Sequence, residues 1–109
     1  MIEVKIFFDE DDRHGDQSTY DYLMHYLLHQ HIQGATLFSA MMGYGQKHHL
    51  HSPMRIGASD ERPLMIMFIE EREKALSVLP HIKEVVKQGL IVINEVQQYY
   101  DTLPKSDLK

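Results

Sequence analysis

The longest apolar run of the chain is Leu64-Met65-Ile66-Met67-Phe68-Ile69. Its pattern predicts a strand, and both faces of this strand are apolar because successive strand side chains point to opposite faces of a sheet. A strand that is apolar on both faces is buried on both faces. If helices cover one face, we expect further subunits to cover the other; a tail or loop of the same chain folded over it is the alternative.

Three further strands are predicted around this run. Apolar residues alternate with other residues over Ile2–Phe8, which predicts a half-buried first strand. The second strand, Ala35–Met42, is nearly apolar on both faces and leads into a glycine-bounded loop that ends at Pro63. Leu90–Val96 forms the fourth strand.

A first helix is predicted from Ser18 to about residue 33, with Ser18 and Asp21 as a capping box and Gly34 as its end. Helical spacing places one set of side chains on its apolar face: Tyr20, Leu23, Met24, Leu27, Leu28 and His31.

A second helix is predicted over residues 71–88. Pro80 lies inside it, and because proline is costly in a helix interior we expect a break there, with Pro80 starting the second half. Gly89 is expected to cap its end.

The order strand, helix, strand, strand, helix, strand is that of the ferredoxin-like split βαβ fold, an α+β class. The expected architecture is therefore βαββαβ, an antiparallel four-stranded sheet with both helices on one face. Residues 1–98 form this domain, and residues 99–109 form a C-terminal tail.

The chain has 109 residues, of which 43% are hydrophobic and 25% charged, as expected for one globular domain with its own core. It contains no cysteine, which excludes disulfides, thiolate zinc sites and cysteine nucleophiles. The net charge of −5 argues against nucleic acid as a partner. No stretch is long enough to span a bilayer and the N-terminus lacks a signal-peptide pattern, so a cytoplasmic location is expected.

The loop between the second and third strands holds the densest set of candidate binding residues. Glycines at its start let backbone amides turn toward an anion, while Lys47, Arg55 and the loop histidines supply positive charge for a phosphate or carboxylate. The alternative is a solvated hairpin loop without a ligand.

Histidine pairs also suggest a metal site. His49 and His51 project from one side of an extended chain, and His25 and His29 from one side of a helix, but each pair is half a site and a solvated surface role is the alternative. His31 is expected at the edge of the core with a hydrogen-bond partner.

No catalytic residue is predicted. A serine beside a histidine lacks an orienting acid, and Asp11 and Asp12 lie in a polar loop where nothing raises a carboxyl pKa toward neutrality. We therefore expect a protein without enzymatic activity.

One set of residues spread along the chain forms a pattern: Glu10, Asp12, Arg13, Gly15, Gly34-Ala35-Thr36, Gly43-Tyr44-Gly45, His51, Arg55, Pro63, Leu79-Pro80 and Gly89-Leu90. This pattern resembles the small uncharacterised bacterial and archaeal PII-like proteins, relatives of the nitrogen-regulatory PII signalling proteins. The resemblance covers about residues 1–96. Ser39 and Ala40 depart from it, because that family often has a basic residue and a glycine there.

The resemblance implies a homotrimer with its sheets facing inward and a regulatory module that binds a small anionic effector at clefts between subunits. It implies an adenine nucleotide as effector, no required cofactor, and a loop at residues 43–63 that contacts a regulated protein or membrane transporter. The candidate ligand contacts are Gly43, Gly45, His51, Arg55 and Arg13.

Two other functions stay open. A trimer similar to the CutA divalent-ion tolerance proteins would use His49 and His51 for metal. An enzyme of the dimeric ferredoxin-like barrel type would form a dimer with an enclosed pocket.

Overall fold

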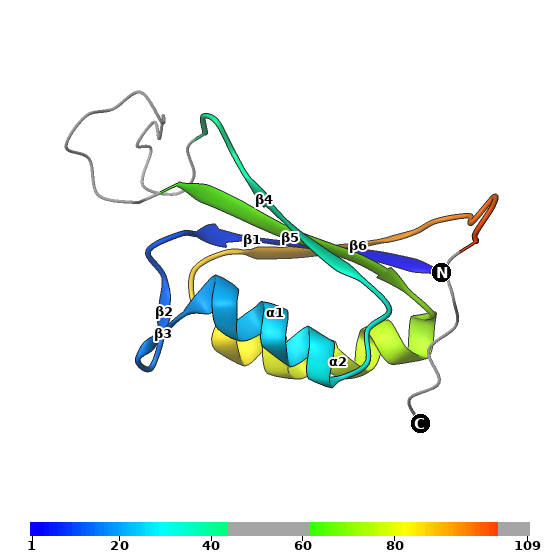
Figure 1. Cartoon of the computed structure of the whole chain (residues 1–109), viewed down its shortest axis with the longest axis horizontal. Helices are drawn as coiled ribbons and strands as arrows, with labels where there is room; N and C mark the ends of the chain where they lie inside the picture. The colour runs from blue at the N-terminus through cyan, green and yellow to red at the C-terminus, as the bar shows by residue number, and fades with distance from the viewer. Residues whose placement is uncertain (44–61, 103–109) are drawn as a thin grey trace.

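The computed structural model describes residues 1–43 and 62–102, which form an antiparallel four-stranded sheet with two helices on one face (Figure 1). The strand order is β4-β5-β1-β6. The main elements are β1 (Ile2–Asp9), α1 (Thr19–His29), β4 (Ala35–Ser39), β5 (Pro63–Glu70), α2 (Arg72–Val85) and β6 (Leu90–Glu95). The predicted ferredoxin-like α+β fold is confirmed.

A short hairpin precedes α1. It consists of β2 (Arg13–His14) and β3 (Gln17–Ser18), and Gly15 turns it with a φ of 62°. A positive φ is accessible to glycine without a Cβ clash, so Gly15 suits the tight reversal.

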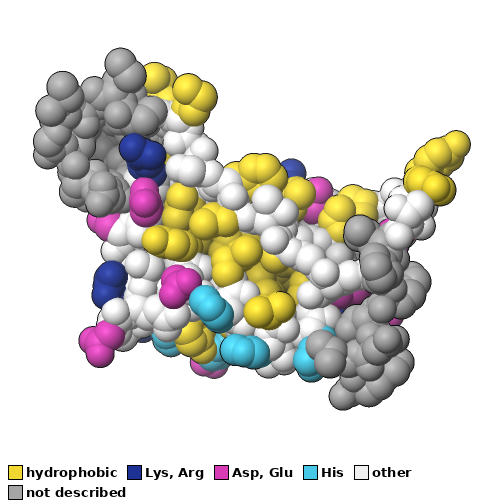
Figure 2. Space-filling view, viewed as in Figure 1, with side chains coloured by type: hydrophobic (Ala, Val, Ile, Leu, Met, Phe, Trp, Pro, Cys, Tyr) yellow, Lys and Arg dark blue, Asp and Glu magenta, His cyan; other side chains and the backbone are white. Residues whose placement is uncertain are grey.

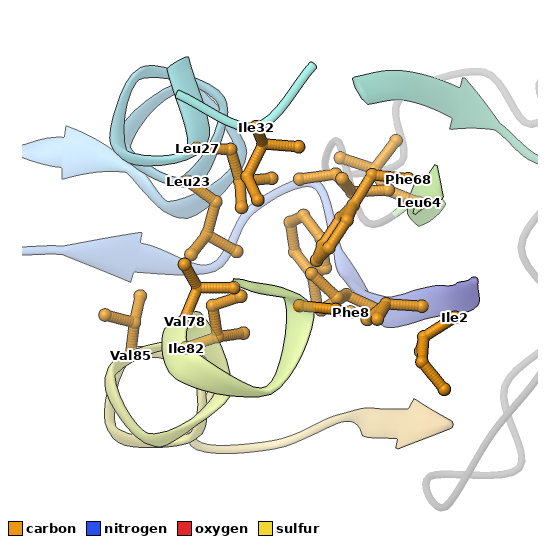
Figure 3. Close-up of a cluster of buried hydrophobic side chains, with 14 residues drawn as sticks. Ile2, Phe8, Leu23, Leu27, Ile32, Leu64, Phe68, Val78, Ile82 and Val85 are labelled. Carbon is orange, nitrogen blue, oxygen red and sulfur yellow. The ribbon is translucent and has the colours of Figure 1, made fainter. Parts of the chain in front are cut away.

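The core lies between the sheet and the helices. Val4 of β1 is aligned with Phe68 of β5 and with Ile93 of β6, and the alternate residues of β1 from Ile2 to Phe8 are all buried. Figure 3 shows Leu23 and Leu27 of α1 facing this layer. Burial of these side chains is the main force that holds helices to sheet.

The third predicted strand, β5, was expected to be buried on both faces. Within a single chain, one of its faces is buried. Leu64, Ile66 and Phe68 of β5 are buried under the helices. On the other face Met65 and Met67 are half-buried and Ile69 is exposed.

The first helix ends earlier than predicted, and His31, not Gly34, provides the stop. His31 has a φ of 61°, its N–H donates to the Leu28 carbonyl at 3.0 Å, and the Ile32 N–H donates to the Leu27 carbonyl at 3.1 Å. These two bonds are those of a Schellman motif. His31 is predicted to have a hydrogen-bond partner, but its buried Nδ1 has none among the described residues.

The predicted capping box at the start of α1 is also wrong. Ser18 is the N-cap residue but makes no side-chain cap hydrogen bond. The Asp21 carboxylate instead accepts a hydrogen bond from Gln17 Nε2 at 2.9 Å and lies 3.4 Å from His25 Nδ1. Leu28, expected on the apolar face, is 66% exposed.

Strand β4 ends at Ser39, three residues before the predicted end. The Ala40 N–H still donates to the Pro63 carbonyl at 2.9 Å, but proline has no N–H to return. The ladder therefore stops at Pro63, and Met41 and Met42 beyond it are exposed.

The predicted break at Pro80 does not occur, because α2 runs without interruption from Arg72 to Val85. Proline removes one helical N–H and leaves the carbonyl of Leu76 without its usual donor. Pro80 is exposed, so water can satisfy that carbonyl.

Replacing this proline should stabilise the protein. We expect Pro80→Ala to raise the free energy of unfolding by about 1–3 kcal/mol, because it restores a helical hydrogen bond and relieves the ring clash. Urea denaturation of both proteins at equal concentration measures the change. A lower unfolding midpoint for Pro80→Ala would contradict this account.

After β6 the described chain continues to residue 102 without secondary structure. The Val96 N–H donates to the Met1 carbonyl at 3.1 Å, and the rings of Tyr99 and Tyr100 beyond it are exposed. Residues 103–109, most of the predicted tail, lie outside the described residues. Within the described ranges, neither helix has the length and apolar content needed to cross a bilayer.

Candidate functional site

The base of the loop between β4 and β5 lies at one end of the sheet (Figure 1). Two backbone hydrogen bonds hold it there: Ala40 N–H to the Pro63 carbonyl at 2.9 Å, and Glu10 N–H to the Arg62 carbonyl at 2.8 Å. The end of β1 is thereby joined to the residues at which the loop re-enters the sheet. These hydrogen bonds attach the base of the loop to the sheet.

Of the predicted ligand contacts, Gly43 lies at this loop base. It is half-buried, and a Cβ built on it would lie 3.3 Å from Pro63 Cγ. That distance is tighter than ordinary contact, so a larger residue would push the loop base away from Pro63.

Arg13, the second predicted contact that is described, lies in the hairpin at the same end of the molecule (Figure 1). Its guanidinium is exposed and donates to the carbonyl of Asp16. The hairpin is joined to α1 by the Thr19 N–H, which donates to the Asp12 carbonyl at 2.9 Å. Arg13 thus holds the turn of its own hairpin.

The other predicted contacts, Gly45, His51 and Arg55, lie outside the described residues, as does His49 of the metal alternative. They remain predictions.

Three carboxylates gather in the turn after β1. One oxygen each from Asp9, Asp11 and Asp12 lies within 4.8 Å of the others, which is close enough to share a cation. Asp12 Oδ2 accepts a hydrogen bond from the Asp9 N–H at 3.2 Å, so this carboxylate already closes the turn. The contact that Asp12 makes here therefore stabilises the turn.

The sheet face opposite the helices forms the second part of the site, and we call it the open face. The alternation of the strands and their register assign its members: Glu3, Lys5, Phe7, Thr36, Phe38, Met65, Met67, Ile69, Leu90, Val92 and Asn94. Several of these are large and apolar yet exposed, with Phe38 at 44% and Leu90 at 57%. Figure 2, which has the same view as Figure 1, shows hydrophobic side chains along the edge of the sheet and toward the helices, with histidines on the side of the helices; the open face is not turned toward the reader in this view.

An aromatic cluster between the helices was missed by the sequence analysis. Tyr22 Oη lies 2.7 Å from His81 Nε2, the rings of His14 and Tyr22 are 4.2 Å apart, and those of Tyr26 and His81 are 4.5 Å apart. Burial raises the pKa of Tyr26 above its usual value, and the nearby Tyr22 raises it further. The cluster joins the hairpin, α1 and α2. No local sequence pattern predicts it, because Tyr22 and His81 are 59 positions apart.

Fold and site together define a class: a ferredoxin-like α+β protein with helices on one side of its sheet, an exposed apolar face on the other, and a loop between β4 and β5 at one end of the sheet. Within this class the chain belongs to the DUF190 family, described as Uncharacterized ACR, whose match extends over residues 1–98. The resemblance to uncharacterised PII-like proteins is confirmed.

Two relatives show this membership in sequence. The chain is 29% identical over 97 residues to a UPF0166 protein of Aquifex aeolicus, covering 89% of this chain and 91% of the relative. It is 30% identical over 97 residues to a UPF0166 protein of Methanocaldococcus jannaschii, covering 88% and 89%.

Solved structures share the fold at low sequence identity. CutA1 from Pyrococcus horikoshii is similar with a TM-score of 0.62 and 14% identity, over 94% of this chain and 89% of that one. CPII from Thiomonas intermedia K12, bound to ADP and bicarbonate, is similar with a TM-score of 0.57 and 15% identity, over 89% and 86%.

Proposed function

We propose that the protein is a PII-like regulatory module that assembles as a homotrimer through its open face. It binds a small anionic effector at clefts between subunits, near the base of the 43–63 loop. An adenine nucleotide is the first candidate, no bond is made or broken, and the loop reports the effector to a regulated protein or membrane transporter.

The exposed apolar open face is the observation that carries this proposal. Phe7 and Phe38 lie on either side of Met65 across three neighbouring strands, so the exposed side chains form one patch. Contiguous apolar patches of this kind mark sites of association. A sheet-to-sheet assembly would bring the loop bases of several subunits to the clefts between them.

The likeness to CPII supports the ligand class. That protein has the same subunit fold and is bound to ADP and bicarbonate, both anions. In this chain we propose that Arg55 and His51 supply the charge for such an anion, and Gly43 and Gly45 the backbone N–H groups.

Signalling requires that the effector bind one loop conformation better than another, because a ligand indifferent to two states shifts neither.

Native mass spectrometry with AMP, ADP, ATP and cyclic nucleotides tests the proposal. We expect a trimer that takes up an adenine nucleotide, and we expect Arg55→Ala to weaken that uptake about 10- to 100-fold through loss of a charged hydrogen bond. Arg72→Ala is the matched control, because Arg72 is exposed at the start of α2 and pairs with Glu95. A confirmed trimer that binds none of these nucleotides contradicts the effector.

The CutA-like alternative has the same fold likeness in its favour, since CutA1 is also a structural neighbour. Calorimetric titration with zinc or copper separates the two functions. Stoichiometric uptake that is lost when His49 and His51 are replaced by alanine, and kept when the exposed His29 is replaced, favours the metal function.

A further inference from the structure

A polar strip crosses the largely apolar open face. It consists of Glu3, Lys5 and Asn94, which we call the polar strip. Lys5 Nζ lies 3.6 Å from Glu3 Oε1, and Asn94 Nδ2 lies 3.5 Å from the same oxygen. Glu3 and Lys5 follow one another on this face of β1, and Asn94 lies directly across from Glu3 on β6.

Apolar side chains surround the strip. Ile69 lies opposite Glu3 on β5, and Met67 and Val92 lie opposite Lys5 on either side. The charged side chains are already partly shielded from water, at 19% exposure for Glu3 and 34% for Lys5. A surface that covers the apolar side chains on both sides of Glu3 and Lys5 therefore covers the ion pair too.

The strip carries no net charge. Apart from Asp9 at the end of β1, the charged side chains that the described strands place on this face are Glu3 and Lys5. Their opposite charges neutralise each other. A lipid surface or nucleic acid is attracted by an excess of cations, and an oppositely charged protein by an excess of either sign. A neutral face with internally paired charges fits another copy of itself, because bringing copies together adds no uncompensated charge.

We propose that the polar strip fixes the arrangement in which the open faces of further copies of this chain meet. The inference rests on the assembly in the proposed function and adds the residues that specify it. A paired polar group inside an apolar interface favours the one arrangement in which it stays satisfied, which is the best-attested role of buried ion pairs.

Breaking the pair has a different effect from removing it. Lys5→Met leaves the Glu3 carboxylate inside the interface without a compensating charge, with only the neutral Asn94 amide beside it. A buried charge of this kind strongly opposes association, whereas an interface without either charge loses little. The proposal therefore predicts that Lys5→Met alone weakens association more than Lys5→Met combined with Glu3→Gln.

Sedimentation velocity over a dilution series measures the effect. We expect Lys5→Met to raise the concentration at which the oligomer dissociates by about 100-fold or more, and Glu3→Gln combined with Lys5→Met to return it to within about tenfold of the parent. Circular dichroism checks that each subunit stays folded.

The ion pair between Arg72 and Glu95 supplies the matched control. Both side chains are exposed, at 55% and 71%, and Arg72 begins the helix on the covered side of the sheet. Arg72→Met should leave dissociation unchanged. A parent that sediments as single copies overturns the docking and the proposed trimer together. An oligomer that responds equally weakly to Lys5→Met and Arg72→Met overturns the role of the strip and leaves the trimer standing.

Discussion

Replacing Gly89 by alanine should cost the protein about 3 kcal/mol of unfolding free energy. A Cβ at this position would lie 2.2 Å from the Phe7 carbonyl oxygen and 2.7 Å from Val86 Cγ1. Phe7 belongs to central strand β1 and is aligned with Leu90 of β6, so its backbone can yield only by disturbing that pairing. Urea denaturation at matched protein concentration measures the loss, since assembly makes stability depend on concentration.

Gly34→Ala is the control for this prediction. No atom of the described residues lies within 4 Å of a Cβ built on Gly34. The change should therefore be neutral, or stabilise by up to about 1 kcal/mol through a less flexible unfolded chain. Equal midpoints for the two variants would show that the contact with Phe7 does not constrain the fold.

The two glycines also show where sequence reasoning about helix ends is limited. Gly34 and Gly89 were both expected to end helices, because glycine is the residue most often found in that role. His31 ends α1 instead, and α2 ends at Val85 with Val86 as its C-cap. Gly89 instead allows the chain to approach β1 closely. No local pattern predicts this role, because it depends on a strand more than eighty positions away in the sequence.

The architecture was predictable because it depends on patterns that repeat over several residues. The alternation in β1 and the apolar run of β5 each determine a strand and the face it buries, and the order of elements restricts the topology. Single-residue expectations were less successful. Ser18 is predicted as a side-chain cap and Pro80 as a break, and the structure shows neither.

The candidate site was predictable only in part. Sequence alone indicated that an open face would remain, since two helices cannot cover both sides of the sheet. It could not show the neutral pairing of Lys5 with Glu3 or the contact of Tyr22 with His81, because both depend on rotamers and on neighbours brought together by the fold.

Met65→Lys should abolish self-association while leaving the subunit folded. Met65 lies at the centre of the apolar patch, aligned with Phe7 on one side and Phe38 on the other. In a single copy the lysine can extend its ammonium into water, so folding should change little. In the assembly each copy would bury an unpaired charge, which opposes association by about 3–5 kcal/mol per copy. Native mass spectrometry should show single copies where the parent forms oligomers.

Leu28→Lys is the matched control, because it places the same charge on an exposed side chain of α1, on the helix side of the sheet. It should leave the subunit number unchanged. If Met65→Lys keeps the parent's oligomer and its sedimentation, the patch is not the interface, and an effector cleft formed by subunits meeting there is excluded. If Met65→Lys gives folded single copies that also lose nucleotide uptake while Leu28→Lys keeps both, the effector site requires more than one subunit.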